Sequence, residues 1–92
     1  MEITFDPAKR DENFRTRGLA FEDAVTIFEG RTLDMVDSRT DYQEERIITV
    51  GMLNDRMMVL VWTQRGHARR IISMRKANER EQENFAERLR KV

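Results

Sequence analysis

The second half of the chain places arginine side chains around a short apolar run. Between Arg65 and Glu81 the only acid is Glu79, and the basic residues are Arg69, Arg70, Arg75, Lys76 and Arg80. The whole chain carries 17 basic and 17 acidic side chains, so this cationic segment is a local feature. A guanidinium group stays charged and presents a rigid fork of donors, which suits it to binding phosphate. The segment predicts a phosphate-binding strand; the alternative is an edge strand that charge protects against aggregation.

Composition limits the kinds of site that the chain can build. There is no cysteine and one histidine, His67, which excludes a disulfide framework and a Cys-bearing or multi-histidine metal site. We therefore expect no metal or other cofactor. The 92 residues predict one domain over residues 1–92. The N-terminus has no signal-peptide pattern, and the longest apolar run, residues 57–62, is far shorter than a membrane helix of roughly 20 residues. We expect a cytoplasmic protein with no membrane contact.

The first third of the chain predicts elements that support this segment. Residues 3–5 alternate as in a short strand, and Asp6-Pro7 is typical of a helix N-cap followed by proline at the first helical position. The helix is predicted over residues 7–15, and Gly18 is placed as its C-cap. A second helix over residues 21–28 has one apolar stripe. The predicted inward-facing residues of the first helix are Ala8 and Phe14.

The middle of the chain predicts a sheet. A polar, acidic loop is expected over residues 37–45, and Asn54-Asp55 is a two-residue hairpin signal. The continuous β-prone run after that turn indicates a central strand that is covered on both faces. The predicted strands cover residues 33–36, 46–53, 57–63 and 69–74.

A charged helix is predicted from Asn78 onward, where Asn78 and Glu81 have the spacing of a capping box. Its apolar stripe is thin and consists of Phe85, Ala86 and Leu89. The predicted fold class is α+β. Two N-terminal helices and a C-terminal helix pack on one side of a three- to four-stranded antiparallel sheet.

Several short motifs, in this order and spacing, resemble one family. They are Phe5-Asp6-Pro7-Ala8-Lys9, Asn13, Gly18-Leu19-Ala20-Phe21-Glu22-Asp23-Ala24, Phe28, Glu45-Arg46, Thr63, Arg65 and Arg70-Ile71-Ile72-Ser73-Met74-Arg75-Lys76-Ala77. Together they resemble the BrnT toxins, the ribonuclease halves of type II toxin–antitoxin pairs. The resemblance implies a RelE-like fold, RNA cleavage that inhibits growth, and neutralisation by a BrnA-like antitoxin. That antitoxin also binds DNA and represses the shared operon, so contact with DNA is expected only through it.

One motif departs from the family pattern. Where the family usually has Asn-x-x-Lys-His-Gly, this chain has Asn13-Phe14-Arg15-Thr16-Arg17-Gly18. Arg17 keeps a positive charge but does not transfer a proton at neutral pH, as a histidine would. The departure puts the activity or its rate in question, while Arg17 remains able to bind phosphate.

Cleavage of RNA without a metal requires three things. The 2′-OH must lose a proton, the charge at phosphorus must be stabilised, and the 5′-oxygen must gain a proton. We expect Arg70 and Arg75 to bind the scissile phosphate, with Glu45 as the base or as an orienting carboxylate. The full catalytic hypothesis names Glu45, Arg46, Arg70, Ser73 and Arg75. The residues expected to bind RNA are Arg17, Thr63, Arg65 and Lys76.

Strand geometry limits this hypothesis. Strict alternation puts Arg69, Ser73 and Arg75 on one face and Arg70 on the other. Arg70 and Arg75 then share a site only if the strand bends or ends near Met74.

Each candidate also has a structural interpretation. Glu45 is either a base or a loop residue paired with an arginine, and Arg17 is either a phosphate ligand or a cation at a helix C-terminus. His67 has a suitable pKa for proton transfer but lies outside the matching motifs, which favours an ordinary surface residue. Trp62 favours the core over base stacking, and the methionines are expected to fill gaps in the sheet.

A second hypothesis belongs to another functional class. The chain would be a non-catalytic module that binds its antitoxin, and Thr16-Arg17 in place of Lys-His favours it. A near-neutral net charge gives no long-range attraction to RNA, so any binding must come from the local cationic segment. A DNA-binding regulator acting alone is the weakest alternative, because only the terminal helix carries many basic residues.

Overall fold

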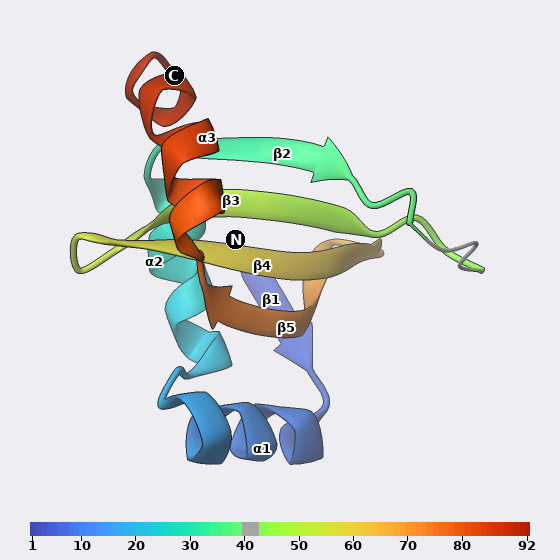
Figure 1. Ribbon diagram of the computed structural model, residues 1–92. Helices are drawn as coiled ribbons and strands as arrows, with labels where there is room; N and C mark the ends of the chain where they lie inside the picture. The colour runs from blue at the N-terminus through green and yellow to red at the C-terminus, as the bar shows by residue number, and fades with distance from the viewer. Residues whose placement is uncertain (40–42) are drawn as a thin grey trace.

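A computed structural model describes residues 1–39 and 43–92 of the chain. The elements in these ranges are β1 Glu2–Phe5, α1 Pro7–Arg17, a 3-10 turn Phe21–Asp23, α2 Ala24–Glu29, β2 Thr32–Val36, β3 Ile47–Leu53, β4 Arg56–Arg65, β5 Ala68–Lys76 and α3 Glu79–Arg90 (Figure 1). Within the described ranges, each helix is too short or too polar to cross a membrane. Part of the loop predicted over residues 37–45 lies outside the described residues.

The strands form one mixed sheet in the order β1-β5-β4-β3-β2. Strands β2 to β5 are an antiparallel meander, whereas β1 pairs in parallel with β5, with Phe5 opposite Ile71. The predicted antiparallel strands are present as β2 to β5, but the prediction missed the fifth strand, β1, and its parallel pairing. The alternation over residues 3–5 is too short to reveal a parallel partner more than 60 positions later in the chain. Beyond Ile71, no strand pairs with this edge of β5 among the described residues.

Helices cover both faces of the sheet. One apolar cluster joins α2 and the 3-10 turn to Leu60, Trp62 and Met74, and a second joins Val59 to Leu89 of α3. In Figure 1, α3 crosses in front of β2, β3 and β4, and α2 lies behind the sheet. The expectation of helices on one side only was wrong, because the central strand β4 is buried on both faces and needs cover on each. The prediction of a doubly covered central strand was confirmed.

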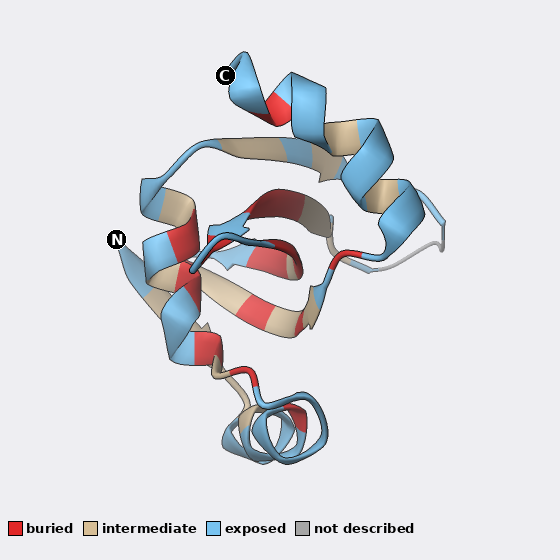
Figure 2. Cartoon of the chain, turned by 60° about the vertical axis from the view of Figure 1, so that its left-hand side comes forward, coloured by how far each residue is buried: buried red, intermediate tan, exposed pale blue. Residues whose placement is uncertain are grey.

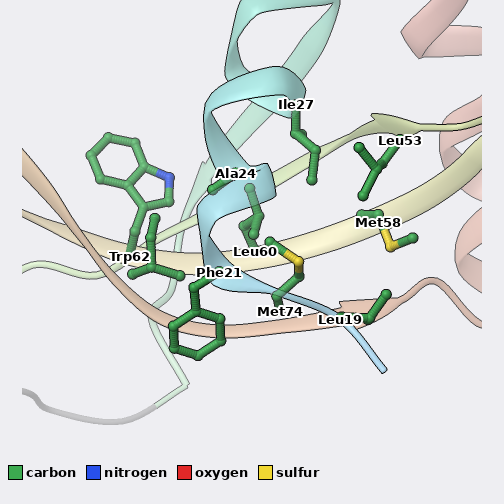
Figure 3. Packing of buried hydrophobic residues seen from close by; sticks show 10 residues of the cluster. Leu19, Phe21, Ala24, Ile27, Leu53, Met58, Leu60, Trp62 and Met74 are labelled. Carbon is green, nitrogen blue, oxygen red and sulfur yellow. The ribbon is translucent and has the colours of Figure 1, made fainter. Parts of the chain in front are cut away.

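The larger cluster lies under α2. Ala24 and Ile27 point from α2 toward Leu53, Met58 and Leu60 of the β3–β4 hairpin (Figure 3). Figure 2 shows that burial is concentrated in the central strands and on the sides of the helices that face them. Along α3, by contrast, most residues are exposed, and Leu89 is its one buried residue. This helix therefore docks through few contacts.

Short-range signals placed the turns and caps correctly. Asn54 and Asp55 have φ values of 50° and 63°, as a two-residue hairpin turn of the primed type requires. Gly18 ends α1 with a left-handed φ of 70°, and Asn78 forms the predicted capping box with Glu81.

The inward face of α1 was not predicted correctly. Phe14 is 50% exposed, Ala8 is also exposed, and the buried residue of this helix is Asn13. The Asn13 amide donates to the Leu19 carbonyl at 3.1 Å, so it ties the end of α1 to the segment that follows. A polar side chain takes the buried position because it satisfies the backbone where the chain turns.

Candidate functional site

A β-bulge in β5 determines which side chains share a face of the sheet. Val61 of β4 lies opposite Ser73, but the next residue, Trp62, lies opposite Ile71. Ile72 is therefore an extra residue without an opposite partner on β4. A bulge of this kind interrupts the alternation of side chains along a strand.

The bulge brings the predicted arginines to the same face. Val59 and Thr63 are four positions apart on β4, so their side chains lie on the same face of the sheet. Arg75 lies opposite Val59, and Arg70 lies opposite Thr63. Residues directly opposite each other across a ladder point to the same face, so Arg70, Ser73 and Arg75 all lie on the α3 side. The strict alternation predicted from sequence was wrong at this position, and the local irregularity in β5 resolves the conflict that it created.

Arg69 lies on the other face, and its predicted grouping with Ser73 and Arg75 was wrong. Its guanidinium carbon lies 4.5 Å from the centres of the Phe28 and Trp62 rings, which is a cation–π arrangement under α2. Arg69 therefore belongs to the packing of the α2 face.

The α3 side of the sheet, which carries Arg70, Ser73 and Arg75, is called the arginine-bearing face. A hollow of about 280 Å³ lies between this face and α3. Its apolar lining comes from the sheet and from α3: Met35, Ile48, Val50, Val59, Val61 and Phe85. Its polar lining consists of Arg17, Arg39, Ser73, Arg75 and Glu81. The hollow thus combines a cationic rim with an apolar floor, a combination that suits a phosphate joined to a flat, largely apolar group.

Arg75 is held by a carboxylate from α3. Its Nη1 and Nη2 atoms donate to the two oxygens of Glu81 at 2.7 and 2.8 Å. The hydrogen bonds from Arg75 lower the pKa of Glu81 to about 2, and the Asn78 backbone N–H adds to this effect against the cost of burial. Glu81 is therefore ionised at neutral pH and is unsuited to accept a proton.

Arg17 enters the hollow from α1, around the open edge of β5. Its Nη1 atom donates to the Met74 carbonyl at 3.1 Å and to the Asn13 side-chain oxygen at 3.0 Å. It also lines a second hollow of about 310 Å³, together with Lys9 and Thr16. Of the two positions that depart from the family motif, Arg17 therefore lines both hollows, and Thr16 lines the second.

A second group of charges lies where β4 and β5 meet their connecting turn. Arg65 donates to both oxygens of Glu44 at 3.1 and 3.0 Å. The pKa of Glu44 is lowered, mainly by these hydrogen bonds and further by the positive charges of Arg65, Arg46 and Arg70. The predicted cations Arg46, Arg65 and Arg70 thus surround a carboxylate that sequence reasoning did not select.

Thr63 and Glu45 form a structural contact. Thr63 is 2% exposed, and its hydroxyl donates to the backbone carbonyl of Glu45 at 2.7 Å. This burial leaves Thr63 little surface to offer to RNA. It fixes the main chain at Glu45, whose side chain is exposed. Glu45 is therefore anchored beside the strand position of Arg70.

The remaining candidates divide between surface and core. Lys76 is exposed at the end of β5, and His67 is exposed in the turn between β4 and β5. Trp62 is 4% exposed and donates its indole N–H to Thr49 at 2.7 Å, which confirms the core interpretation. Met57, Met58 and Met74 are buried as expected, whereas Met52 is 42% exposed.

Sequence reasoning missed three charged residues near this face. From the sequence, Glu81 is predicted only to cap the last helix, and Glu44 and Arg39 belong to the acidic loop over residues 37–45 without an assigned role. Arg39 lines the hollow, binds the buried carboxylate of Asp37 at 2.8 Å, and adds positive charge beside Arg75. The signal that could have identified Glu81 is its place in the first turn of a helix that begins directly after the arginine-rich strand.

One family model matches the chain. It describes BrnT, a ribonuclease toxin of type II toxin–antitoxin systems, and it matches residues 5–81. The matched segment begins at the end of β1 and closes at Glu81, so it includes every side chain of the polar lining. A search of curated proteins found no match to the chain.

Proposed function

Because this chain belongs to the BrnT family of type II ribonuclease toxins, we propose that it cleaves RNA internally without a metal ion and thereby inhibits growth. A toxin of this type has a protein antitoxin as its partner. We propose that this partner is BrnA-like, that it carries all contact with DNA, and that the pair acts in the cytoplasm.

The observation that carries this proposal is the shared face of Arg70, Ser73 and Arg75. Arg75 lies in the hollow and binds the scissile phosphate, where its charge stabilises the developing phosphorane. Arg70 is five positions away along β5, which is about 15 Å for a strand. It therefore binds a neighbouring phosphate rather than the scissile one, as does Arg65 near it.

The apolar floor gives the nucleotide base a place to pack. Phe85 of α3 and Val61 of β4 line the same hollow as Arg75. Proteins that bind unpaired RNA stack or pack its bases on such surfaces while cations hold the backbone. The arrangement favours a single-stranded substrate, because the base of a duplex would not reach the floor.

Proton transfer is the step of the reaction for which the site offers the fewest suitable side chains. Glu81 is excluded as a base by its low pKa. Glu45 has a main chain that Thr63 fixes beside Arg70, and its side chain is exposed. Because that place is about 15 Å from Arg75, Glu45 is too far from a phosphate bound there to take its 2′-OH proton. Its proposed role is therefore to orient an arginine that binds the neighbouring phosphate. Ser73 lies on the same face and can donate a hydrogen bond to a phosphate oxygen. Because no histidine stands at position 17, we expect slow turnover.

The test is incubation of the purified protein with RNA in the presence of EDTA. Native protein should cleave, and Arg75→Ala should lose at least ~100-fold of the rate because one charge-stabilising donor group is removed. Arg80→Ala is the matched control, since Arg80 is an exposed arginine of α3 outside the hollow. Equal cleavage by native protein and Arg75→Ala would show that the site has been misplaced, and cleavage that requires added metal would refute the metal-free mechanism.

The geometry of Arg17 favours a second candidate, a degenerate toxin retained for binding its antitoxin. Its guanidinium is bound to Asn13 and Met74, so it acts as a structural link. If native protein does not cut RNA while Thr16→Lys/Arg17→His does, the missing Lys-His pair is the lesion. Normal growth of cells that express the soluble native protein without its partner would agree with this candidate.

A further inference from the structure

Glu81 makes contacts in two elements at once. Its Oε1 atom accepts from the backbone N–H of Asn78 at 2.9 Å and from Arg75 Nη1 at 2.7 Å, while Oε2 accepts from Arg75 Nη2 at 2.8 Å. Its own backbone N–H donates to the Asn78 side chain at 2.8 Å. The first turn of α3 thus immobilises the Glu81 carboxylate, and this carboxylate binds Arg75 of β5.

The ion pair with Glu81 occupies only one edge of the Arg75 guanidinium group. Arginine has five N–H donors in a fixed planar arrangement. Glu81 takes one hydrogen from each terminal nitrogen of Arg75, and the Lys76 carbonyl lies 3.4 Å from Nη1. The donors of the other edge are Nε–H and the second hydrogen of Nη2. They form a parallel pair with the spacing that a phosphate accepts.

We propose that Glu81 is a positioning residue that fixes the plane of the Arg75 guanidinium, so that its side edge faces a phosphate of RNA in the hollow. The inference rests on the proposed function, because it takes Arg75 as the phosphate ligand of that site. It adds the residue that orients this ligand and identifies α3 as the element that supplies it.

The neighbouring charges show why Arg75 needs such a partner. Arg17 and Arg39 line the same hollow, and the charge of Arg39 acts against that of Arg75. Arg39 is itself paired with Asp37, so the carboxylate of Glu81 compensates chiefly the charge of Arg75. Without Glu81, the flexible Arg75 side chain would turn toward solvent. With Glu81 in place, the group is held in one orientation before the substrate arrives, which is the condition for effective electrostatic catalysis.

A purely stabilising role for Glu81 is the competing explanation, and the choice of variants separates the two. Glu81→Gln removes the charge but keeps a side chain that serves in a capping box. Glu79→Gln is the matched control, because Glu79 is an exposed residue of the same helical turn outside the hollow, and the net charge changes equally. Glu81→Asp is the second variant, with the charge kept but the carboxylate withdrawn from Arg75.

The first experiment observes Arg75 directly by the side-chain Nε–Hε signal in ¹⁵N–¹H spectra, assigned with Arg75→Lys. The probes are inorganic phosphate and a 2′-O-methyl oligoribonucleotide, which cannot be cleaved by attack of its own 2′-oxygen. We expect a sharp signal that shifts with both probes in native protein and in Glu79→Gln. We expect it to broaden, and to lose the shift, in Glu81→Gln and Glu81→Asp. The proposal would be overturned if the Arg75 signal of native protein did not shift with either probe. It would also be overturned if the signal shifted equally in folded Glu81 variants.

The second experiment measures steady-state cleavage. If positioning is lost while binding remains, Glu81→Gln should reduce kcat by ~10–100-fold and change KM by less than ~3-fold. A parallel loss of folded protein and of activity, with unchanged kcat per folded molecule, would show a stabilising role only. Should native protein not cleave RNA at all, the proposed function fails, and the response of the Arg75 signal still decides whether Glu81 orients this arginine toward phosphate.

Discussion

Arg75 and Glu81 link the folding stability of the protein to acid pH. The pKa of Glu81 falls from 4.5 to about 2, chiefly because its oxygens accept hydrogen bonds from Arg75. A carboxyl group with a lowered pKa in the folded state stabilises the fold fully above its unfolded pKa. This stabilisation is lost as the pH falls through the folded pKa. The upper limit is about 3 kcal/mol. Because both side chains are partly exposed, we expect about 1–2 kcal/mol.

Glu81→Gln should therefore lower the free energy of unfolding by about 1–2 kcal/mol at pH 7 and by almost nothing near pH 2. Urea denaturation followed by circular dichroism across this range measures the difference, with Glu79→Gln as the control variant. A loss that is the same at both ends of the range would mean that the ion pair does not supply this stability.

Residue types and local order identified part of the site, but not the pairing of its charges. Arg70, Ser73 and Arg75 could be selected because phosphate chemistry needs such side chains close together on a strand. Glu81 could not be assigned to Arg75 from sequence, because its capping role already explains its presence. An ion-pair partner is determined by which elements dock, and here α3 folds back over β5.

At the scale of elements, the bulge at Ile72 is a second feature that could not be predicted from the sequence. Ile71 and Met74 are both fully buried in the α2-side cluster although they are three positions apart. An unbroken strand cannot direct both side chains to one face, so one extra residue is inserted between them. The pattern Ile71-Ile72-Ser73-Met74 contains no glycine that would announce this irregularity. The core imposes the bulge, and the bulge in turn aligns the arginines on the opposite face.

Helix α2 packs tightly against strand β3 at Gly51. A Cβ atom at this position would lie 2.7 Å from Ile27 Cγ2 and 3.1 Å from Thr32 Cγ2. Ile27 is fully buried and cannot move aside freely. Gly51→Ala should therefore destabilise the fold by about 1–3 kcal/mol through overpacking.

The matched control is Gly30→Ala at the end of α2. There the nearest atom to an added Cβ is the Ile27 carbonyl oxygen at 3.6 Å, an ordinary contact, and the backbone φ of −92° is accessible to alanine. Thermal denaturation of the two variants should show a clear drop in Tm for Gly51→Ala and little change for Gly30→Ala. Equal Tm values would indicate that α2 shifts away from β3 at low cost.

The elements that sequence predicted are those with short-range determinants. The N-cap at Asp6, the C-cap at Gly18 and the turn at Asn54-Asp55 depend on a few neighbouring residues. The parallel pairing of β1 with β5 and the placement of α3 on the opposite face from α2 depend on the whole chain. Sequence patterns therefore gave the α+β class correctly but not the layer arrangement.

At the scale of the whole molecule, the charges balance and only their distribution can attract RNA. The chain has no formal net charge, yet Arg65, Arg70 and Arg75 all occupy the α3-side face of the sheet. Two of these arginines are already paired with carboxylates, Arg65 with Glu44 and Arg75 with Glu81. Binding must therefore come from a few local phosphate contacts, without strong long-range steering.

This distribution predicts a weak dependence of RNA affinity on salt. Each phosphate contact with a single strand contributes a slope of about −0.7 to a plot of log K against log salt. Contacts by Arg65, Arg70 and Arg75 should thus give a slope of about −2. Fluorescence anisotropy with a labelled 2′-O-methyl oligoribonucleotide at several KCl concentrations measures it. Arg70→Ala should make the slope shallower by about 0.7, and Arg80→Ala should leave it unchanged. A slope near zero in native protein would contradict phosphate binding by this face. A loss with Arg80→Ala equal to that with Arg70→Ala would mean that RNA contacts the exposed side of α3 instead.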